Sequence, residues 1–420
     1  MKKLQARKSI QALVLIGLMT IATPLANAQK FIVLYNFGGP PDGGLPQASL
    51  IDEHGVLYGT TYIGGTGNCA VEGVTVGCGT VFKLSGKTET VLYSFQGQPD
   101  GAFPVGGLLR DKSGNLYGTT TEGGAYGYGA IFKLTGKKET ILYSFKGVPD
   151  GSGPTGGLVE DAMGNFYGTT GNGGANPGNG GNPAGVGTVF KLDTKGNETV
   201  LYSFCSDLNC TDGDYPQDYG LIMDASGNLY GTTGAGGSGC SGGLGCGTVF
   251  ELDKSGRESV LYSFCTEPGC ADGKYPTGGL VMDTDGSLYG TTSQGGNGQG
   301  VEGVVFKLDA NGSEWVLHTF CSDPGCADGE TPFAGLTMDA QGNLYGTALD
   351  GGGGGGAVFE LDMAGNFNVL HAFSGLPGPI QPIGGLVMNA KGILYGTTYQ
   401  GGSGNCKIYD GCGVVFKIKP

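Results

Sequence analysis

Short runs of apolar and β-branched residues alternate with glycine-rich polar stretches along the chain, and the same runs return in the same order. The string LYGTT, or a close variant, occurs seven times at a mean spacing of about 56 residues. Each copy lies between a GGL-type run and a GTVFKL-type run, and a VLYSF-type run completes the unit. Runs of this composition, bounded by Gly, Asp and Asn, are typical of β-strands. Each unit is therefore expected to hold four strands, the first of them at residues 106–111 in the second unit.

Turn signals connect these runs. The first two strands of a unit are joined by Asp-x-x-Gly sequences, as at residues 111–114 and 161–164. They favour hairpin turns, because Asp suits the first position of a turn and Gly accepts a positive φ. Seven four-stranded antiparallel units predict an all-β fold, a seven-bladed β-propeller. An open β-solenoid is the alternative, but its coils are usually shorter and build no local antiparallel meanders.

The two ends of the repeat array complement each other. The first element after residue 28 is a VLYSF-type strand at residues 31–37, whereas the array ends on a GTVFKL-type strand at residues 414–418. The last unit therefore lacks its outer strand, and the N-terminus has one to spare. Because pairing would remove both exposed edges, we expect the N-terminal strand to join the C-terminal blade and close the ring.

The first 28 residues are typical of a secretory signal peptide, with a basic start, an apolar run and Ala-Asn-Ala before Gln29. We expect residues 1–28 to be removed and residues 29–420 to form a single propeller domain. No later apolar run approaches the roughly 18 residues of a transmembrane helix. The mature protein is thus expected to be secreted or periplasmic, without a membrane span.

Composition narrows the range of partners. Glycine contributes 89 of the 420 residues without the Gly-X-Y period of collagen, and the 39% of hydrophobic residues is enough to bury a core. The formal net charge is −14. Because binding to phosphate backbones needs a basic surface, we expect neither nucleic acid nor anionic membranes as partners.

Loops of a four-stranded meander alternate between the two faces of the disc. The turns between first and second strands, and between third and fourth strands, are short and uniform; we call their side the turn face. The loops between second and third strands and the links between blades are long and varied, and we call their side the variable face. Varied loops on a rigid scaffold usually carry binding, so a ligand is expected on the variable face.

All twelve cysteines lie in the loops and links of the variable face, in neighbouring pairs. An even number of cysteines in an exported chain favours disulfides. No pair has the CxxC spacing of a metal site. We predict no metal here and six local disulfides, joining Cys69 to Cys78, Cys205 to Cys210, Cys240 to Cys246, Cys265 to Cys270, Cys321 to Cys326, and Cys406 to Cys412.

Tyrosines of the variable-face loops are the candidate ligand-binding residues. Exposed aromatic rings beside polar groups suit sugars or extended peptides, and ordinary loop packing is the alternative. The candidates are Tyr62, Tyr126, Tyr128, Tyr215, Tyr219, Tyr275, Tyr399 and Tyr409. The threonines that end the second strands are expected to add a ring of hydroxyls, among them Thr60, Thr119 and Thr232.

An aspartate followed by glycine recurs in the links between blades. These residues are Asp42, Asp100, Asp150, Asp212, Asp272 and Asp328. An Asp-Gly turn is the simpler interpretation. The alternative is that the carboxylates, with Asp214 and Glu330 nearby, bind Ca²⁺, which prefers several oxygen ligands. The sequence predicts no other cofactor.

Little in the sequence points to catalysis. Of the three histidines, His54 lies in a hairpin turn, and His318 and His371 take the Tyr position of the VLYSF run, so none is expected on the variable face. The sequence contains no GxSxG, Walker loop or HExxH motif. Paired carboxylates could still hydrolyse glycosides at a suitable separation, which the sequence does not reveal. No catalytic residue is therefore assigned.

The combined pattern GGL...D..GNLYGTT..GG....GTVFKL...G..TVLYSF resembles the GloVer tandem repeat (Gloeobacter/Verrucomicrobia type) of exported bacterial proteins, and more loosely the NHL-type propeller blade. The resemblance covers residues 31–418. It implies a propeller and export, and it implies no defined activity.

Three functions fit these features. The leading hypothesis is a secreted or periplasmic, non-catalytic binding propeller that acts as a monomer on an extracellular ligand such as a glycan or a protein. The first alternative is an extracellular carbohydrate-active or metal-assisted hydrolase or lyase that uses loop carboxylates at the channel mouth. The second is a structural protein of the envelope or matrix. Converging carboxylates would favour the enzyme, whereas a flat aromatic loop surface would favour binding.

Overall fold

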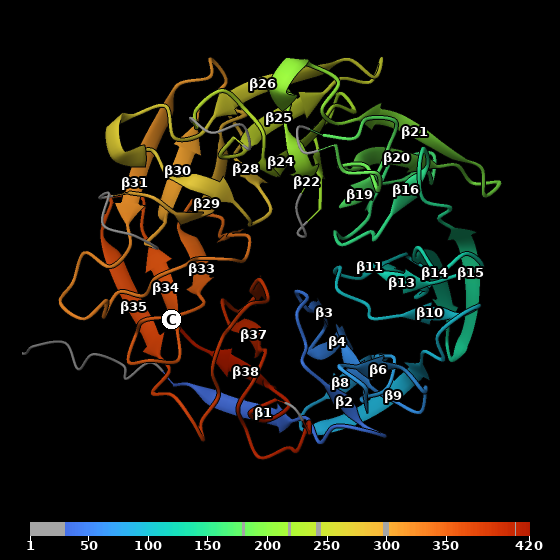
Figure 1. Ribbon diagram of the computed structural model, residues 1–420. Helices are drawn as coiled ribbons and strands as arrows, with labels where there is room; N and C mark the ends of the chain where they lie inside the picture. Colours follow the sequence, from blue (N-terminus) through green and yellow to red (C-terminus); the bar gives the residue numbers. More distant parts are fainter. Residues whose placement is uncertain (1–29, 179–180, 217–219, 241–244, 297–301, 408) are drawn as a thin grey trace, which may run out of the picture.

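Seven blades surround a central axis (Figure 1). The computed structural model describes residues 30–178, 181–216, 220–240, 245–296, 302–407 and 409–420, so the expected signal peptide and Tyr219 lie outside the described residues. Within them there is no α-helix, only strands and two short 3₁₀ turns, η1 (Leu208–Cys210) and η2 (Pro268–Cys270). The all-β, seven-bladed propeller predicted from the repeats is confirmed.

Each blade is an antiparallel sheet with four strand positions, counted outward from the axis. The blades are numbered 1 to 7 in chain order, and the strands at each position are given below in that order. The innermost strands are β3 (Ile51–Glu53), β11 (Leu109–Arg110), β17 (Val159–Glu160), β23 (Ile222–Met223), β28 (Val281–Met282), β32 (Thr337–Met338) and β36 (Val387–Met388). The second strands are β4 (Val56–Thr61), β12 (Leu116–Thr120), β18 (Phe166–Thr170), β24 (Leu229–Ala235), β29 (Leu288–Gln294), β33 (Leu344–Ala348) and β37 (Leu394–Thr398).

The two outer positions carry most of the apolar residues. The third strands are β8 (Thr80–Ser85), β14 (Ala130–Thr135), β20 (Thr188–Leu192), β25 (Thr248–Leu252), β30 (Val304–Leu308), β34 (Ala357–Leu361) and β38 (Val414–Ile418). The outer strands are β9 (Thr88–Ser94), β15 (Lys138–Ser144), β21 (Glu198–Ser203), β26 (Glu258–Ser263), β31 (Glu314–Thr319), β35 (Phe367–Ala372) and β1 (Ile32–Asn36).

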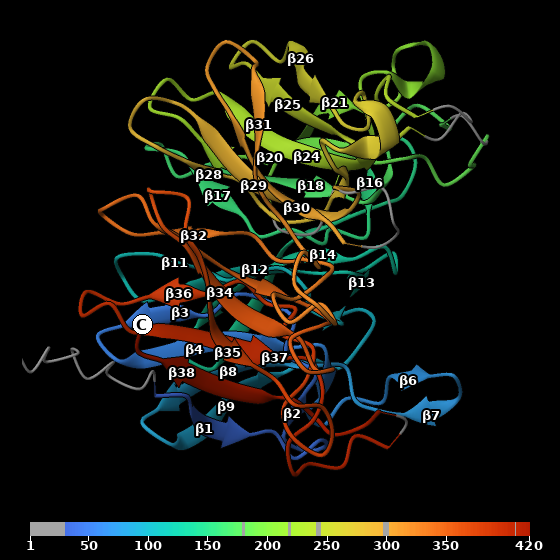
Figure 2. The same cartoon turned by 90° about the vertical axis from the view of Figure 1, so that its left-hand side faces the viewer.

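Short additional strands connect the links to the loops. Three two-stranded ladders pair β2 (Gly43–Gly44) with β5 (Ile63–Gly64), β10 (Gly101–Ala102) with β13 (Glu122–Gly123), and β16 (Gly151–Ser152) with β19 (Asn172–Gly173). In blades 4 and 5 the same role falls to β22 (Asp214–Pro216) and β27 (Lys274–Pro276), which extend the second strands. A hairpin of β6 (Ala70–Val71) and β7 (Val74–Thr75) projects from the disc (Figure 2).

The ring closes as predicted. Strand β1 pairs antiparallel with β38, with Ile32 opposite Lys417 and Asn36 opposite Val414. Blade 7 is therefore built from β36, β37 and β38 near the C-terminus and β1 near the N-terminus. Figure 1 shows β1 beside β38. This pairing covers the edge of β38 that would otherwise be open, and it gives β1 a partner strand.

Aspartates fold the hairpins of the turn face. In blade 2, Asp111 Oδ1 accepts hydrogen bonds from the backbone N–H groups of Ser113 and Asn115 at 2.9 and 2.8 Å. The Tyr117 hydroxyl donates to the other carboxylate oxygen at 3.1 Å. The repeated Asp-x-x-Gly sequence therefore gives the predicted turn, and the LYGTT tyrosine fastens it.

Phenylalanines join neighbouring blades. The Phe of each third strand is buried and lies edge-on to the Phe that follows the outer strand of the preceding blade. All seven pairs have ring centroids 5.0–5.7 Å apart, as in Phe204 with Phe250 and Phe373 with Phe416. Edge-to-face packing of this kind adds about 0.5–1.5 kcal/mol per pair to the gain from burial. The core thus consists of seven equivalent seams between blades.

The innermost strands are shorter than the sequence predicts. A strand is expected over residues 106–111, yet only Leu109 and Arg110 pair with β12. The preceding glycines approach the next blade, where a Cβ on Gly106 would lie 2.5 Å from the carbonyl oxygen of Gly156. Near the axis, residues before Leu109 thus pack against the next blade, and they do not pair with β12 as expected.

Candidate functional site

Six disulfides hold the variable face, with the pairings that the sequence predicts. Three lie in loops between second and third strands, and three lie in the links after the outer strands of blades 3, 4 and 5. Each closes a loop of five to nine residues, and none joins two distant blades. Disulfides of this number are consistent with an oxidising compartment outside the cytosol. Among the described residues, no helix is long and apolar enough to span a bilayer.

Reduction is expected to loosen these loops before it affects the blades, because each disulfide constrains only its own short loop. Hydrogen exchange followed by mass spectrometry, with and without a dithiol at 25 °C, measures this. Loop amides such as those of residues 205–210 should exchange at least about ten times faster after reduction, while third-strand amides keep their protection. Simultaneous loss of protection in loops and third strands would contradict the prediction.

Two groups of side chains bring three potential metal-ligand atoms within 4.8 Å of one another. They are Cys240, Cys246 and Cys265, and Cys321, Cys326 and Glu330. Every cysteine in both groups belongs to a disulfide. A thiolate ligand is therefore not available in either group.

The link aspartates organise their own links. Asp100 Oδ2 accepts hydrogen bonds from the Tyr93 hydroxyl and from the Gln96 backbone N–H, both at 2.9 Å, and Oδ1 accepts one from Gly101 N at 2.7 Å. The same tyrosine contact recurs at Asp42, Asp150, Asp212 and Asp272. This geometry supports the interpretation as a structural turn. Calcium binding by these carboxylates stays a prediction.

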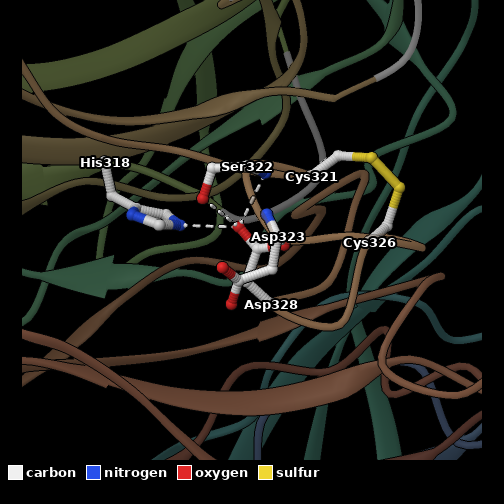
Figure 3. Close-up of polar contacts among 6 residues, drawn as sticks. All are labelled: His318, Cys321, Ser322, Asp323, Cys326 and Asp328. Atoms are coloured by element: carbon white, nitrogen blue, oxygen red, sulfur yellow. Dashed lines mark hydrogen bonds and ion pairs between the residues drawn. A yellow bond between two sulfur atoms is a disulfide. The ribbon is translucent and has the colours of Figure 1, made fainter.

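At Asp328 the contacting side chain is a histidine, His318, where the other link aspartates contact a tyrosine (Figure 3). His318 Nε2 lies 3.2 Å from Asp328 Oδ2, which also accepts hydrogen bonds from the backbone and hydroxyl of Ser322. Burial lowers the pKa of His318, and the Asp328 charge opposes that effect. The expectation that no histidine reaches the variable face is therefore wrong for His318, because the link folds back onto its outer strand.

The predicted ring of hydroxyls is not exposed. Thr60, Thr119 and Thr232 are between 1% and 7% accessible. Thr119 Oγ1 donates to the carbonyl of Gly156 at 3.1 Å, so the innermost segment of blade 3 covers it. Thr119 therefore links blades 2 and 3 near the axis, and Thr60 and Thr232 are buried.

Three of the candidate tyrosines pack where blades 7 and 1 meet. The Tyr62 ring lies 4.9 Å from that of Phe103, and the rings of Tyr399 and Tyr409 are 6.1 Å apart. Burial is the main cause that raises the pKa of both Tyr62 and Tyr399. These three side chains are half-buried, which corresponds to the alternative of loop packing.

Tyr126 and Tyr128 present open rings. They lie in the loop between β13 and β14 and are 55% and 48% exposed. The loop is pinned on both sides: Ala125 N donates to Ser144 Oγ at 3.0 Å, and Gly153 N donates to the Tyr128 carbonyl at 3.0 Å. Two exposed rings, two residues apart in the sequence, thus stand on a loop that is held by hydrogen bonds and not by a disulfide.

Tyr215 and Tyr275 lie in the extra strands of blades 4 and 5, both with positive φ, at 53° and 55°. Tyr215 is 37% exposed, and its hydroxyl accepts a hydrogen bond from Asn182 Nδ2 at 3.1 Å. Tyr275 is half-buried beneath the ammonium group of Lys274, which is 5.6 Å from the ring centre. They lie on other blades than Tyr126, and the structure does not bring them into one cluster with it.

Carboxyl groups gather on the variable face between blades 5 and 6. Glu330 and Asp350 exchange two backbone hydrogen bonds, at 3.0 and 3.2 Å. Burial raises the pKa of both side chains, and the charges of Asp350 and Glu302 raise that of Glu330 further. Burial is also the main cause that raises the pKa of Asp214 to about 6. Glu330 and Asp214 could be singled out from the sequence, whereas no motif marks Glu302 and Asp350.

Grooves separate neighbouring hairpins on the turn face. One of them has a volume of about 580 Å³ and lies between blades 7 and 1, where Asp52, His54, Lys391 and Tyr395 line it. An equivalent groove of about 360 Å³ lies between blades 5 and 6. The sequence did not indicate these grooves, because their width depends on the angle between blades.

Solved structures share the fold at low sequence identity. Oligogalacturonate lyase from Vibrio parahaemolyticus is 11% identical, with a TM-score of 0.53 over 93% of this chain and 97% of that chain. Puromycin hydrolase is 13% identical, with a TM-score of 0.50 over 85% of this chain and 50% of that chain. A luciferin-regenerating enzyme is 14% identical, with a TM-score of 0.45 over 76% of this chain and 91% of that chain. At these identities the likeness concerns the fold alone.

No curated protein sequence matches the chain. The family model described as the Gloeobacter/Verrucomicrobia repeat matches residues 25–244, 177–355 and 298–420, which together extend over all seven blades. The motifs that define the strands, the hairpin turns and the seams are those of this repeat. The chain therefore belongs to the Gloeobacter/Verrucomicrobia repeat family.

Proposed function

We propose that this chain is an exported, non-catalytic propeller that binds a neutral glycan through Tyr126 and Tyr128 on its variable face. The single observation that carries the proposal is the pair of half-exposed rings on a pinned loop. Rings held in place before binding lose little conformational entropy when a ligand stacks on them. The twelve cysteines, all in disulfides, support export.

The surroundings of the two rings suit a sugar. Aromatic faces pack against the C–H faces of a pyranose, while nearby amides bond its hydroxyls. The side-chain amide of Gln98 lies beside the loop, where it donates to the Ala125 carbonyl at 3.0 Å. Gly147 lies against the Tyr128 ring, and Val148, the residue after it, is exposed. The net charge of −14 disfavours polyanionic polymers. A neutral polysaccharide therefore fits best.

Co-sedimentation with insoluble neutral polysaccharides such as cellulose, chitin and β-1,3-glucan tests the proposal. The variant Tyr126→Ala/Tyr128→Ala is expected to bind the retained polymer at least about ten times more weakly, a loss of about 1.4 kcal/mol. Tyr215→Ala and Tyr275→Ala, on other blades, should have smaller effects.

Three substitutions serve as controls. Lys112→Ala and Ser226→Ala alter exposed positions of the turn face, and Trp315→Ala removes a 48% exposed aromatic ring from an outer strand. Binding should survive all three. If Trp315→Ala weakened binding as much as the double tyrosine variant, or if the protein bound an extended peptide and none of the polysaccharides, the assignment to a glycan at this loop would be wrong.

A hydrolase or lyase is the second candidate, favoured by the carboxyl groups of Glu302, Glu330 and Asp350. The raised pKa values of Glu330 and Asp350 fit a general acid beside a carboxylate. Release of reducing ends from the same polysaccharides tests this candidate. Activity that Glu330→Gln abolishes would establish it, whereas bound polymer that stays intact would favour binding alone.

A further inference from the structure

Five outer strands carry a glutamate at the same place. Pairing with the third strand sets this position opposite the leucine of that strand: Glu89 opposite Leu84, and Glu139 opposite Leu134. The other members are Glu198, Glu258 and Glu314, opposite Leu192, Leu252 and Leu308. Because the register is equal in each blade, all five side chains occupy one structural position.

Each glutamate faces the tyrosine and link aspartate of the preceding blade. The clearest case is Glu198, whose Oε2 lies 3.4 Å from the hydroxyl of Tyr143, and this hydroxyl also donates to Asp150 at 2.9 Å. The Oε1 atoms of all five glutamates are buried without a hydrogen-bond partner, and so is Oδ1 of Asp150. A protonated Glu198 carboxyl supplies the hydrogen-bond donor that Asp150 Oδ1 lacks.

The two remaining seams show that these positions belong together. In blades 5 and 6 the tyrosine is replaced by His318 and His371. The glutamate of the following blade is then replaced by Phe367 and by Phe31, which precedes β1. The rings stack, with centroids 3.7 Å apart for His318 and Phe367 and 3.8 Å apart for His371 and Phe31. Glutamate is thus present where tyrosine faces it and absent where histidine does.

Electrostatics oppose ionisation of the five glutamates. Burial first, and then the charge of the link aspartate, raise the pKa of Glu89, Glu139 and Glu314 to about 7 and that of Glu198 and Glu258 to about 8. The facing groups are Asp42 and Tyr35 for Glu89, Asp100 and Tyr93 for Glu139, Asp150, Tyr143 and Lys146 for Glu198, Asp212, Asp207 and Tyr202 for Glu258, and Asp272, Glu267 and Tyr262 for Glu314.

We propose that these five seams make the contacts between blades pH-dependent. Each glutamate stays protonated between two blades, and the propeller becomes less stable when the glutamates ionise. A protonated Glu198 carboxyl can share its hydrogen with Asp150, whereas an ionised one places a second negative charge beside it. The seams with His318 and His371 contain no such pair. The propeller is therefore built to be tightest in a mildly acidic medium.

The direction of the pH dependence follows from linkage. In the unfolded chain these glutamates ionise near their ordinary pKa of 4.5, whereas in the folded chain they ionise near 7 to 8. The stabilisation is fully present below about pH 4.5 and is lost as the pH rises through about 7 to 8. Solvent screening at these half-buried groups reduces the size of the effect, but not its sign.

Thermal unfolding of the full propeller between pH 5 and pH 9 tests the proposal. The Tm of the wild type is expected to fall by about 5 °C or more between pH 5 and pH 8. Glutamine keeps the shape of glutamate and cannot ionise, so the variant with Glu89, Glu139, Glu198, Glu258 and Glu314 all changed to Gln should lose most of this fall. At pH 8 it should melt above the wild type.

Exposed glutamates provide the matched control. The variant Glu72→Gln/Glu122→Gln/Glu160→Gln removes three carboxylates from the surface and should keep the pH dependence of the wild type. If this control flattened the profile equally, general charge repulsion would explain the effect and the proposal would fail.

A direct titration covers the case in which the fivefold variant does not fold. Wild-type protein with ¹³C at the glutamate carboxyl carbons should show five resonances that titrate between about pH 6.5 and 8.5 in NMR spectra. If every glutamate titrated near pH 4.5, the proposal would be overturned. Neither measurement involves a ligand, so the result does not depend on the proposed glycan binding.

Discussion

Deletion of strand β1 is expected to lower the Tm by more than about 10 °C or to cause aggregation at room temperature. A chain that starts at residue 39 would leave the edge of β38 unpaired. It would also lose the fully buried Phe37, whose ring lies 5.1 Å from that of Phe82 in blade 1. Truncation of a buried Phe alone typically costs about 3–5 kcal/mol. Calorimetry and size-exclusion chromatography measure the effect.

A matched truncation isolates the strand. A chain that starts at residue 30 removes only what precedes β1 and should melt like the longer chain. A peptide of residues 30–38 added in trans should restore part of the lost Tm, since it can pair with β38. An unchanged melt after deletion of β1 would show that the ring does not need its closing strand.

Phe250→Ala is expected to destabilise the propeller by about 3–5 kcal/mol, a large effect for a single substitution. The Phe250 side chain is fully buried, and its ring lies 5.1 Å from that of Phe204 in the preceding blade. It also fills the space left by Gly231, where an added Cβ would lie 2.7 Å from its Cζ atom. Denaturant unfolding measures the change.

Two variants test whether shape rather than hydrophobicity causes the loss. Gly231→Ala overfills the same space and should also destabilise, by about 1–3 kcal/mol. Met163→Ala, at a 74% exposed side chain, should stay within about 0.5 kcal/mol of the wild type. Equal midpoints for Phe250→Ala and Met163→Ala would contradict the role given to the aromatic seams.

The fold could be predicted from the sequence because the repeated motifs specify contacts within one blade. The alternation in GTVFKL places Phe and Leu in a core, and Asp-x-x-Gly specifies the hairpins from local turn chemistry. The short innermost strands could not be predicted, since Gly106 packs closely against Gly156 of the next blade, a contact that no motif within one repeat specifies. The cover over Thr119 comes from Gly156, 37 residues further along the chain, and could not be predicted for the same reason. The contact of His318 with Asp328 spans only 10 residues, but it depends on how the link folds back onto the outer strand.

The candidate site was only partly visible for a related reason. Tyr62 and Tyr126 both follow second strands and stand among glycines, so their surroundings in the sequence are alike. Their difference in exposure comes from Phe103, which packs against Tyr62, while Tyr126 meets no such partner ring among the described residues. Exposure of a loop side chain depends on the neighbouring blade, and no pattern within one repeat carries that information.

The pairing of Tyr with Glu, and of His with Phe, has a consequence for engineering propellers of this family. Half of each seam is encoded in one repeat and half in the next, so a blade moved to a position with the other seam type would be mismatched at its borders. The segment from one link aspartate to the glutamate of the following outer strand can be exchanged intact on one condition. The blades on both sides of it must form the same type of seam, either tyrosine with glutamate or histidine with phenylalanine. Blades bordered by tyrosine seams on both sides, such as blade 3, are therefore interchangeable modules, whereas blade 6, between His318 and Phe31, is not.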